Sequence, residues 1–285
     1  MRSSSFKKRL TFIDVIAKTG KWFYLGFFLC VTLLPLIWLV ISSFKTNFEF
    51  ETQPFSFPDV WQVQNYVAAM QIGGLSRLFL NSVIVAICST TLNIFVSSMG
   101  AFAISREKFR FNETLLNIIL AGVLIPIIAL MVPYFKIIST LGIYDTLLGL
   151  VLTYAAINIP ISVFLIHGFM GSIPVELEEA AVIDGCSFTQ RFTKIIFPLT
   201  KPGLVTAGTL MFIYCWNEFT YAMLLTSSES SRTLQLGIRF FKSQFVTDYT
   251  SMLAAIVISM VPTIIVYVFL HDKIISGMTS GAVKG

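Results

Sequence analysis

Long, uninterrupted runs of apolar residues dominate the chain, with no periodic separation into an apolar and a polar face. Each run has about 20 residues, the length that a helix needs to cross the hydrocarbon core of a bilayer. Five of the six runs contain no Asp, Glu, Lys or Arg, and the fifth in chain order contains only Glu218. Prolines within the runs are compatible with spans, because neighbouring helices can accommodate a break. The pattern predicts an all-α integral membrane protein with six transmembrane helices: Trp22–Phe44, Leu78–Ile104, Leu115–Phe135, Leu147–Phe169, Leu204–Leu225 and Met252–Leu270.

The distribution of Lys and Arg predicts the orientation of these spans. The segment before the first run and those after the second, fourth and sixth hold 14 of these residues, and the alternate segments hold 6. Because positively charged loops tend to stay on the cytoplasmic side, we expect both termini inside the cell. The chain then divides into an N-terminal cytoplasmic segment (1–21), a six-span domain (22–271) that includes a cytoplasmic loop (171–203), and a cytoplasmic C-terminal tail (272–285).

The composition excludes several classes of function. Charged residues make up 12% of the chain, whereas about a quarter of the residues of a soluble domain are charged. The net charge of +5 belongs to the cytoplasmic flanks of the spans, and no basic face with stacking aromatics points to nucleic acid as a partner. The sequence has no GxxxxGK[ST] phosphate loop, and its Cys and His residues are not at metal-ligand spacing. We expect no catalytic residue, metal or cofactor in this chain.

The loop between the fourth and fifth runs predicts two short helices joined by a glycine turn. Pro174 suits a first helical turn, and the Glu residues that follow suit the positive end of a helix dipole. Gly185 can end this helix in the left-handed conformation, and Ser187 with Gln190 forms a capping-box pattern for the second helix. Such a helix pair could transmit a movement of a soluble partner to the spans in the membrane. Taken alone, however, this helix-forming string favours a hairpin that merely connects two spans.

The loop resembles that of the membrane subunits of binding-protein-dependent ABC importers, in which Glu-Ala-Ala is followed at fixed spacing by Gly, Ile and Leu-Pro. This chain has the same residues at the same spacing, with Phe in place of Leu: Glu179-Ala180-Ala181, Gly185, Ile195 and Phe197-Pro198. The resemblance implies that a helix in this loop couples the pore to a cytoplasmic ATPase through five residues: Glu179, Ala180, Ala181, Asp184 and Gly185.

Segments outside this loop are similar to the maltose-type, oligosaccharide branch of the same family. The resemblance extends over about residues 20–285, and the C-terminal tail looks like that of the smaller, second permease of such pairs. Five segments carry it: Phe79–Ser82, Val132–Phe135, Leu141–Thr146, Trp216–Phe219 and Ser276–Gly285.

The resemblance implies a set of partners and a location. We expect a heterodimeric pore with a second permease, two ATPase subunits that hold the ATP and Mg, and an extracellular sugar-binding protein. The chain itself would be no enzyme, and it would lie in the plasma or inner membrane of a prokaryote, in contact with lipid. Its C-terminal tail would contact the ATPases through five residues: Gly281, Ala282, Val283, Lys284 and Gly285.

Glu218 is the one residue within the runs that is Asp, Glu, Lys or Arg, so it is a functional candidate. The sequence leaves two roles open for it, a structural hydrogen-bonded role with Asn217 or a role in a gate or in the sugar path. Trp216 could stack on a sugar ring, although packing within the helix bundle is the simpler interpretation. We take Trp216, Asn217 and Glu218 as candidates for the translocation path or gate.

Two alternatives to a sugar importer have to be considered. A permease of the same class could carry a non-sugar solute, such as a phosphodiester or a polyamine. A six-span channel or secondary transporter is the alternative of another class, but the sequence shows neither a selectivity-filter motif nor an arginine-rich voltage sensor.

Overall fold

Helices account for all the regular secondary structure in the residues that the computed structural model describes, which are 12–71, 74–107, 109–244 and 248–282. The prediction of an all-helical chain is confirmed for these residues. The elements, in chain order, are α1 (Phe12–Ser42), α2 (Asn47–Thr52), α3 (Gln64–Gln71), α4 (Leu75–Arg106), α5 (Asn112–Ala121), η2 (Gly122–Leu124), η3 (Ile127–Leu130), α6 (Met131–Thr140), α7 (Leu147–Ile157), α8 (Ile159–Gly171), α9 (Glu176–Ile183), α10 (Phe188–Gln190), η4 (Arg191–Ile196), α11 (Phe197–Leu199), α12 (Lys201–Asn217), α13 (Thr220–Leu225), α14 (Leu234–Gln244) and α15 (Tyr249–Ala282).

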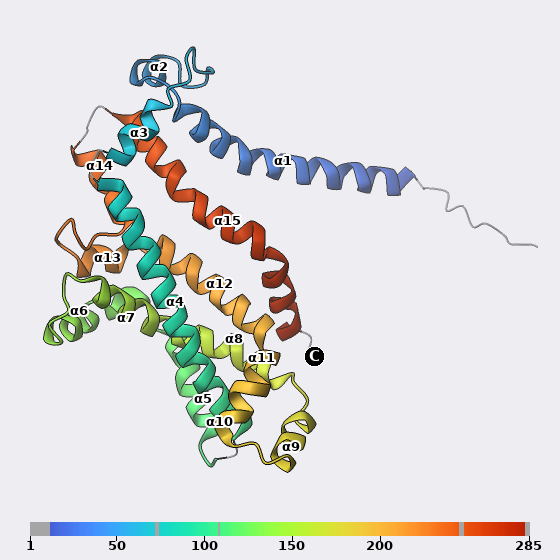
Figure 1. Ribbon diagram of the computed structural model, residues 1–285. Coiled ribbons are helices and arrows are strands. Elements are labelled where there is room, and N and C mark those ends of the chain that lie inside the picture. The colour runs from blue at the N-terminus through green and yellow to red at the C-terminus, as the bar shows by residue number, and fades with distance from the viewer. Residues whose placement is uncertain (1–11, 72–73, 108, 245–247, 283–285) are drawn as a thin grey trace, which may run out of the picture.

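The long helix α4 forms the axis of a helix bundle (Figure 1). It packs against α7, α8 and α12, and α12 packs in turn against α15. The buried positions of α4 include many small and polar residues, which allow helix backbones to approach closely in an apolar environment. Asn93 is fully buried, and its side-chain amide donates a 2.8 Å hydrogen bond to the backbone carbonyl of Ala155 on α7. Small and polar side chains therefore hold the centre of the bundle together.

Three helices are long and apolar enough to cross a membrane by themselves, and they match the first, second and sixth predicted spans: Ala17–Ser42, Leu75–Arg106 and Tyr249–Asp272. Three further helix pairs meet the same criterion only if each bent pair counts as one span. The bends are 99° between Asn112–Leu124 and Ile127–Thr140, 50° between Leu147–Ile157 and Ile159–Gly171, and 74° between Phe188–Leu199 and Lys201–Asn217. The described chain thus has between three and six spans.

The third, fourth and fifth predicted spans are not continuous helices. The fourth bends by 50° at Asn158, just before Pro160 in the first turn of α8. In the third span Pro126 has no amide hydrogen and forces the residue before it out of the helical region, and Ile125 accordingly has φ −77° and ψ 121°. In the fifth span α12 ends at Asn217, and Glu218 is extended with a ψ of 128°. By contrast, Pro35 and Pro262 lie inside α1 and α15 without ending them.

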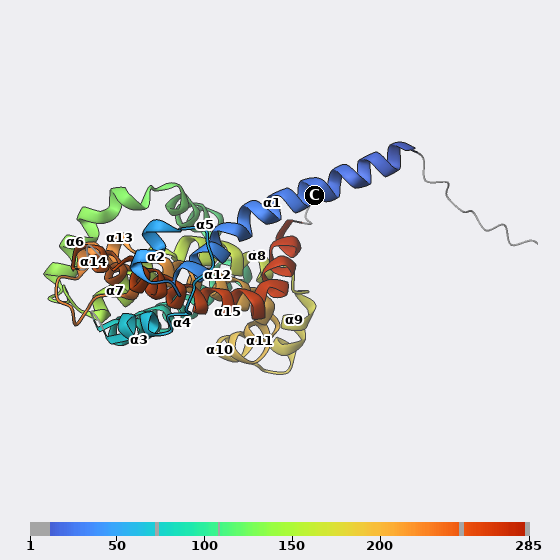
Figure 2. The ribbon, with the colours of Figure 1, turned by 90° about the horizontal axis from the view of Figure 1, so that it is seen from above.

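Helix α1 stands apart from the bundle along most of its length (Figure 2), and most of its apolar side chains are exposed. Its C-terminal end is fixed by a small cap that contains α2. There Lys45 is fully buried, and its ammonium group donates hydrogen bonds of 2.7 and 3.0 Å to the carbonyls of Gln53 and Pro54. Helix α1 contacts α15, but the described chain leaves most of its apolar surface uncovered.

Asp145 fastens the turn before α7 to the turn after α13. Its backbone is left-handed, with φ 58°, and its amide donates to the carbonyl of Leu225 at 2.9 Å. Its carboxylate accepts hydrogen bonds from the amides of Ser227 and Ser228, at 2.8 and 3.0 Å, and from the hydroxyl of Ser231. Partial burial acts to raise the pKa of Asp145, but these hydrogen bonds outweigh it and hold the pKa well below its usual range.

We predict that Asp145→Asn destabilises the fold at neutral pH, because an amide nitrogen would face the donors that the carboxylate now accepts. Asn tolerates the left-handed backbone, so the change tests the charge and not the turn. The depressed pKa means that the carboxylate stabilises the fold fully above its unfolded pKa of about 4 and loses this effect progressively as the pH falls from there through the lower pKa of the folded state. The unfolding temperature of the variant should therefore lie about 2–4 °C below that of the wild type at pH 7, and the difference should shrink at acidic pH. The exposed residue Asp59 provides a control, as Asp59→Asn should show no such pH-dependent difference.

Candidate functional site

Helix α9 ends in a turn that only a residue with left-handed backbone geometry can complete. Gly185 has φ 81°, and its amide donates to the carbonyl of Val182 at 3.0 Å, while the amide of Cys186 donates to that of Ala181 at 2.9 Å. These two bonds form the Schellman pattern of a helix C-terminus. The prediction that Gly185 ends this helix is confirmed.

The second helix of the loop begins as its sequence predicts but changes its pitch after one turn. Ser187 and Gln190 form the reciprocal capping box, with bonds of 2.8 and 3.4 Å. The next six residues, Arg191–Ile196, form a π-helix, a rare form that occurs frequently at functional sites. Phe192 is buried beneath it, with its ring 5.1 Å from that of Phe102 on α4. The loop is thus packed on the bundle.

The two sides of α9 differ in exposure. Four of the five candidate coupling residues, Glu179, Ala180, Asp184 and Gly185, are exposed. Ala181 is buried, as is Glu178 on the same inner side. The outer side also exposes apolar side chains, including that of Ile183 with 85% exposure. This outer face combines acidic, small and apolar residues, and exposed apolar side chains of this kind occur at protein-binding surfaces.

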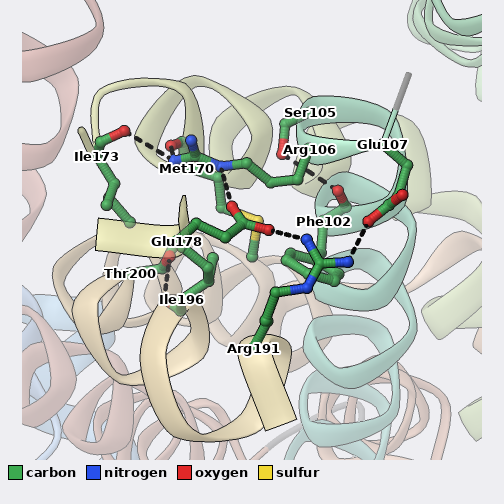
Figure 3. Close-up of polar contacts among 10 residues, drawn as sticks. All are labelled: Phe102, Ser105, Arg106, Glu107, Met170, Ile173, Glu178, Arg191, Ile196 and Thr200. Atoms are coloured by element: carbon green, nitrogen blue, oxygen red, sulfur yellow. Dashed lines mark hydrogen bonds and ion pairs between the residues drawn. The ribbon is translucent and has the colours of Figure 1, made fainter. Parts of the chain in front are cut away.

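Glu178 lies at the centre of a buried ion-pair cluster (Figure 3). One of its carboxylate oxygens accepts a 2.6 Å hydrogen bond from Arg191, whose second guanidinium nitrogen donates at 2.8 Å to Glu107. The other oxygen of Glu178 lies 3.7 Å from Nε of Arg106. Arg106 also donates to the carbonyls of Met170 and, at 2.9 Å, of Ile173. The end of α4, the end of α8, α9 and the π-helix therefore meet at two arginines and two glutamates.

The sequence did not reveal this cluster. Glu178 was expected only to complement the helix dipole of α9, and Arg106 and Arg191 were counted only as cytoplasmic charges. One feature of the sequence indicates where Arg106 lies. It follows the second apolar run so closely that it belongs to the same helix. No pattern within the chain pairs residues that are 72 or more positions apart.

Glu218 lies at the break between α12 and α13, where it is only 9% exposed. Its carboxylate accepts bonds from the amides of Tyr221 and Ala222, at 2.8 and 3.0 Å, and so caps the start of α13. It also accepts a 2.6 Å bond from the hydroxyl of Tyr154 on α7. The expected structural partner, Asn217, instead donates to the carbonyl of Ile213 at 2.8 Å. Glu218 thus has structural hydrogen bonds, but with partners other than the one expected.

Trp216 and Asn217 face different surroundings. Trp216 is 1% exposed, and its indole donates a 2.9 Å bond to the carbonyl of Ser259 on α15. Asn217 is exposed and borders a pocket of about 490 Å³, whose lining includes Ile127, Tyr214 and Glu218. Of the three candidates for the path, Asn217 and Glu218 therefore border a cavity, whereas Trp216 packs inside the bundle.

Tyr221 connects the two broken spans. Its amide binds Glu218 at the break of the fifth span, and its hydroxyl donates a 2.8 Å hydrogen bond to the carbonyl of Ile127, next to Pro126 at the break of the third. A shift at one break therefore disturbs a backbone contact at the other.

A bundle of apolar, partly broken helices, together with an exposed helix held against it by buried ion pairs, defines the membrane subunit of a transport system. The chain belongs to the family of binding-protein-dependent transport system inner membrane components, whose sequence profile matches residues 93–279. This membership confirms the resemblance on which the sequence interpretation rests.

Three relatives illustrate the family. An ABC transporter permease protein of Caldicellulosiruptor, ORF2, is 39% identical, and the alignment covers 96% of this chain and 100% of that protein. The sulfoquinovosyl glycerol transport system permease SmoH of Agrobacterium fabrum is 34% identical, with 89% of each chain covered. The trehalose transport system permease SugB of Mycobacterium tuberculosis is 32% identical, with 89% of this chain and 93% of that protein covered.

A solved structure shares the fold. A chain of a bacterial ABC transporter that imports the acidic polysaccharide alginate superposes with a TM-score of 0.81. The two chains are 25% identical, and the superposition covers 94% of this chain and 99% of the other.

We predict that Glu218→Leu destabilises the protein, because it leaves a buried hydroxyl and two amides without an acceptor. Each buried group left unsatisfied costs about 1–3 kcal/mol. Glu218→Gln keeps one oxygen for these donors and should lie between the Leu variant and the wild type. Thermal unfolding of the purified protein measures the order of the three, and Asn217→Ala at the exposed neighbouring position is the control. A Leu variant that unfolds at the wild-type temperature would contradict the capping role.

Proposed function

We propose that this chain is a permease subunit of an ATP-driven, binding-protein-dependent importer of sugars, with oligosaccharides as its solutes. The subunit forms half of the translocation pore. The observation that carries the proposal is helix α9, which exposes Glu179 and Ala180 of the family's Glu-Ala-Ala string and ends in a completed glycine turn. The family membership and the sugar-transporting relatives support it. Because the family is established, a channel or a secondary transporter no longer competes with this function.

The chain needs partners to work in this way. A second permease would complete the pore, and it would cover apolar surfaces that the single chain leaves exposed, such as that of α1. Two ATPase subunits would supply the energy, since the sequence lacks a phosphate loop. The family description supports a binding protein as the partner that delivers the solute. We place the subunit in the inner or plasma membrane, with six spans and both termini in the cytoplasm, on the Lys and Arg distribution.

In the proposed mechanism α9 converts movement of the ATPases into movement of the spans. The acidic side chains of Glu179 and Asp184 would enter a basic groove, and the small side chain of Ala180 permits close approach. Gly185 keeps α9 at a fixed angle to the helix that follows. The C-terminal tail, 281–285, would make a second contact with the ATPases. Residues 283–285 lie outside the described residues, and truncation at residue 278 followed by ATPase measurement would test that contact.

At the other end of the bundle the solute would pass the breaks in the third and fifth spans. Asn217 and Glu218 border a pocket there, and Tyr221 joins the two breaks. A path that opens and closes requires segments whose backbone can change direction, and broken helices provide them. We therefore keep Asn217 and Glu218 as path or gate residues, with Trp216 as the buried side chain that supports them.

Uptake measurements test whether the solute is a sugar. The subunit, reconstituted into vesicles with its second permease, ATPases and binding protein, should take up labelled oligosaccharide only when ATP is inside and the binding protein outside. A phosphodiester and a polyamine serve as the competing solutes. Uptake of one of these in preference to every oligosaccharide tried would overturn the assignment to carbohydrates.

We predict that Gly185→Leu uncouples transport from ATP hydrolysis. A left-handed backbone costs a branched residue about 1–2 kcal/mol, so the turn would rearrange and α9 would change its angle. Stimulation of the ATPase by the loaded binding protein should fall several-fold, with insertion of the subunit into the membrane unchanged. Gly185→Asn is the matched control, because Asn adopts this backbone readily. Full stimulation and uptake in the Leu variant would remove the coupling role of this turn.

A further inference from the structure

Helix α9 is held to the bundle by side-chain contacts as well as by the chain segments before and after it. The chain joins it to α8 on one side and to the π-helix on the other, yet its buried carboxylate also binds the end of α4. The side chains of Glu178 and Arg106 are 6% and 7% exposed, and that of Arg191 is 17% exposed. A third helix, remote in sequence, is thus fixed to α9 by charge.

The ion pairs of Glu178 resist displacement of α9 relative to α4. A buried carboxylate that loses its arginine is left as an uncompensated charge, which is strongly unfavourable. Glu178 is hydrogen bonded to Arg191 on one side and paired with Arg106 on the other. Arg106 in turn binds the carbonyls of Met170 and Ile173 at the end of α8. Helix α9 cannot therefore leave its place without carrying these elements along or breaking the cluster.

The far end of α4 lies beside the break in the fifth span. Phe79 is near the start of α4, and its ring centroid is 5.5 Å from that of Trp216, two residues before Glu218. A helix rises 1.5 Å per residue, so Phe79 and Arg106 are about 40 Å apart along the axis. Within the described chain α4 is one unbroken helix. It therefore connects the ion-pair cluster directly to the region of the pore.

We propose that Glu178 is a positioning residue that fastens α9 to α4, so that α4 carries the displacement of α9 to the break at Glu218. This inference rests on the proposed docking of α9 with an ATPase. It adds a route for the movement that does not follow the chain, since the spans covalently joined to the loop are the fourth and the fifth, whereas α4 is the second. Removing the charge of Glu178 leaves docking intact and disconnects α4.

The test compares Glu178→Gln with Glu176→Gln in the assembled transporter. Both changes remove one negative charge from the first turn of α9, but Glu176 is exposed. A photo-cross-linking residue at Ile183, on the exposed face of α9, reports docking with the ATPase. In Glu178→Gln we expect normal cross-linking and basal ATP hydrolysis, with solute uptake per ATP reduced about tenfold, as is common for coupling between two sites. Glu176→Gln should match the wild type.

A second pair of variants separates coupling from a general loss of structure. Arg106→Gln should lower the uptake per ATP as Glu178→Gln does, and the double variant should be no worse than either, because these two residues form the contact between α9 and α4. Additive losses, or normal uptake per ATP in Glu178→Gln with cross-linking preserved, would overturn the inference. Absence of cross-linking at Ile183 in the wild-type complex would instead overturn the proposed docking of α9. If Glu178→Gln fails to assemble, Arg106→Gln decides alone, since normal uptake per ATP in that variant also overturns the inference.

Discussion

A helix that ends inside an apolar bundle leaves backbone amides or carbonyls that water does not reach, and these groups must find other partners. Side chains meet this requirement at each of the interruptions that matter here. Glu218 accepts the amides at the start of α13, Tyr221 donates to the carbonyl of Ile127, and Arg106 donates to the carbonyls at the end of α8. The bundle can therefore contain broken spans without losing its stability.

The same three residues also connect elements that are distant in the sequence. Glu218 brings α7 to the start of α13 through Tyr154, and Tyr221 brings the third span to the fifth. Arg106 brings α4 to both α8 and Glu178. Each side chain that satisfies a helix end thus also holds a neighbouring helix. In a transporter this means that the points where a helix can bend are the points where its movement reaches the next helix.

Local pattern was sufficient to predict the features that depend on neighbouring residues. The apolar runs located α1, α4 and α15, and the turn at Gly185 and the capping box at Ser187 appear as expected. Features that depend on distant residues could not be predicted. The carboxylate at the break accepts a hydrogen bond from Tyr154, which lies 64 positions earlier. Nothing in the Glu-rich string of α9 distinguishes the buried Glu178 from its exposed neighbours. The role of a charged residue is set by the side of the helix on which it falls once the bundle has formed.

The division of α9 into two sides separates recognition from transmission. Four of the five residues that would contact an ATPase are exposed, whereas the fifth, Ala181, is buried together with Glu178 on the side that faces the bundle. Substitutions on the outer side can therefore alter the choice of ATPase while the connection to α4 stays as it is. Under the proposed function, such a subunit could change its ATPase partner during evolution and keep the residues that attach α9 to α4.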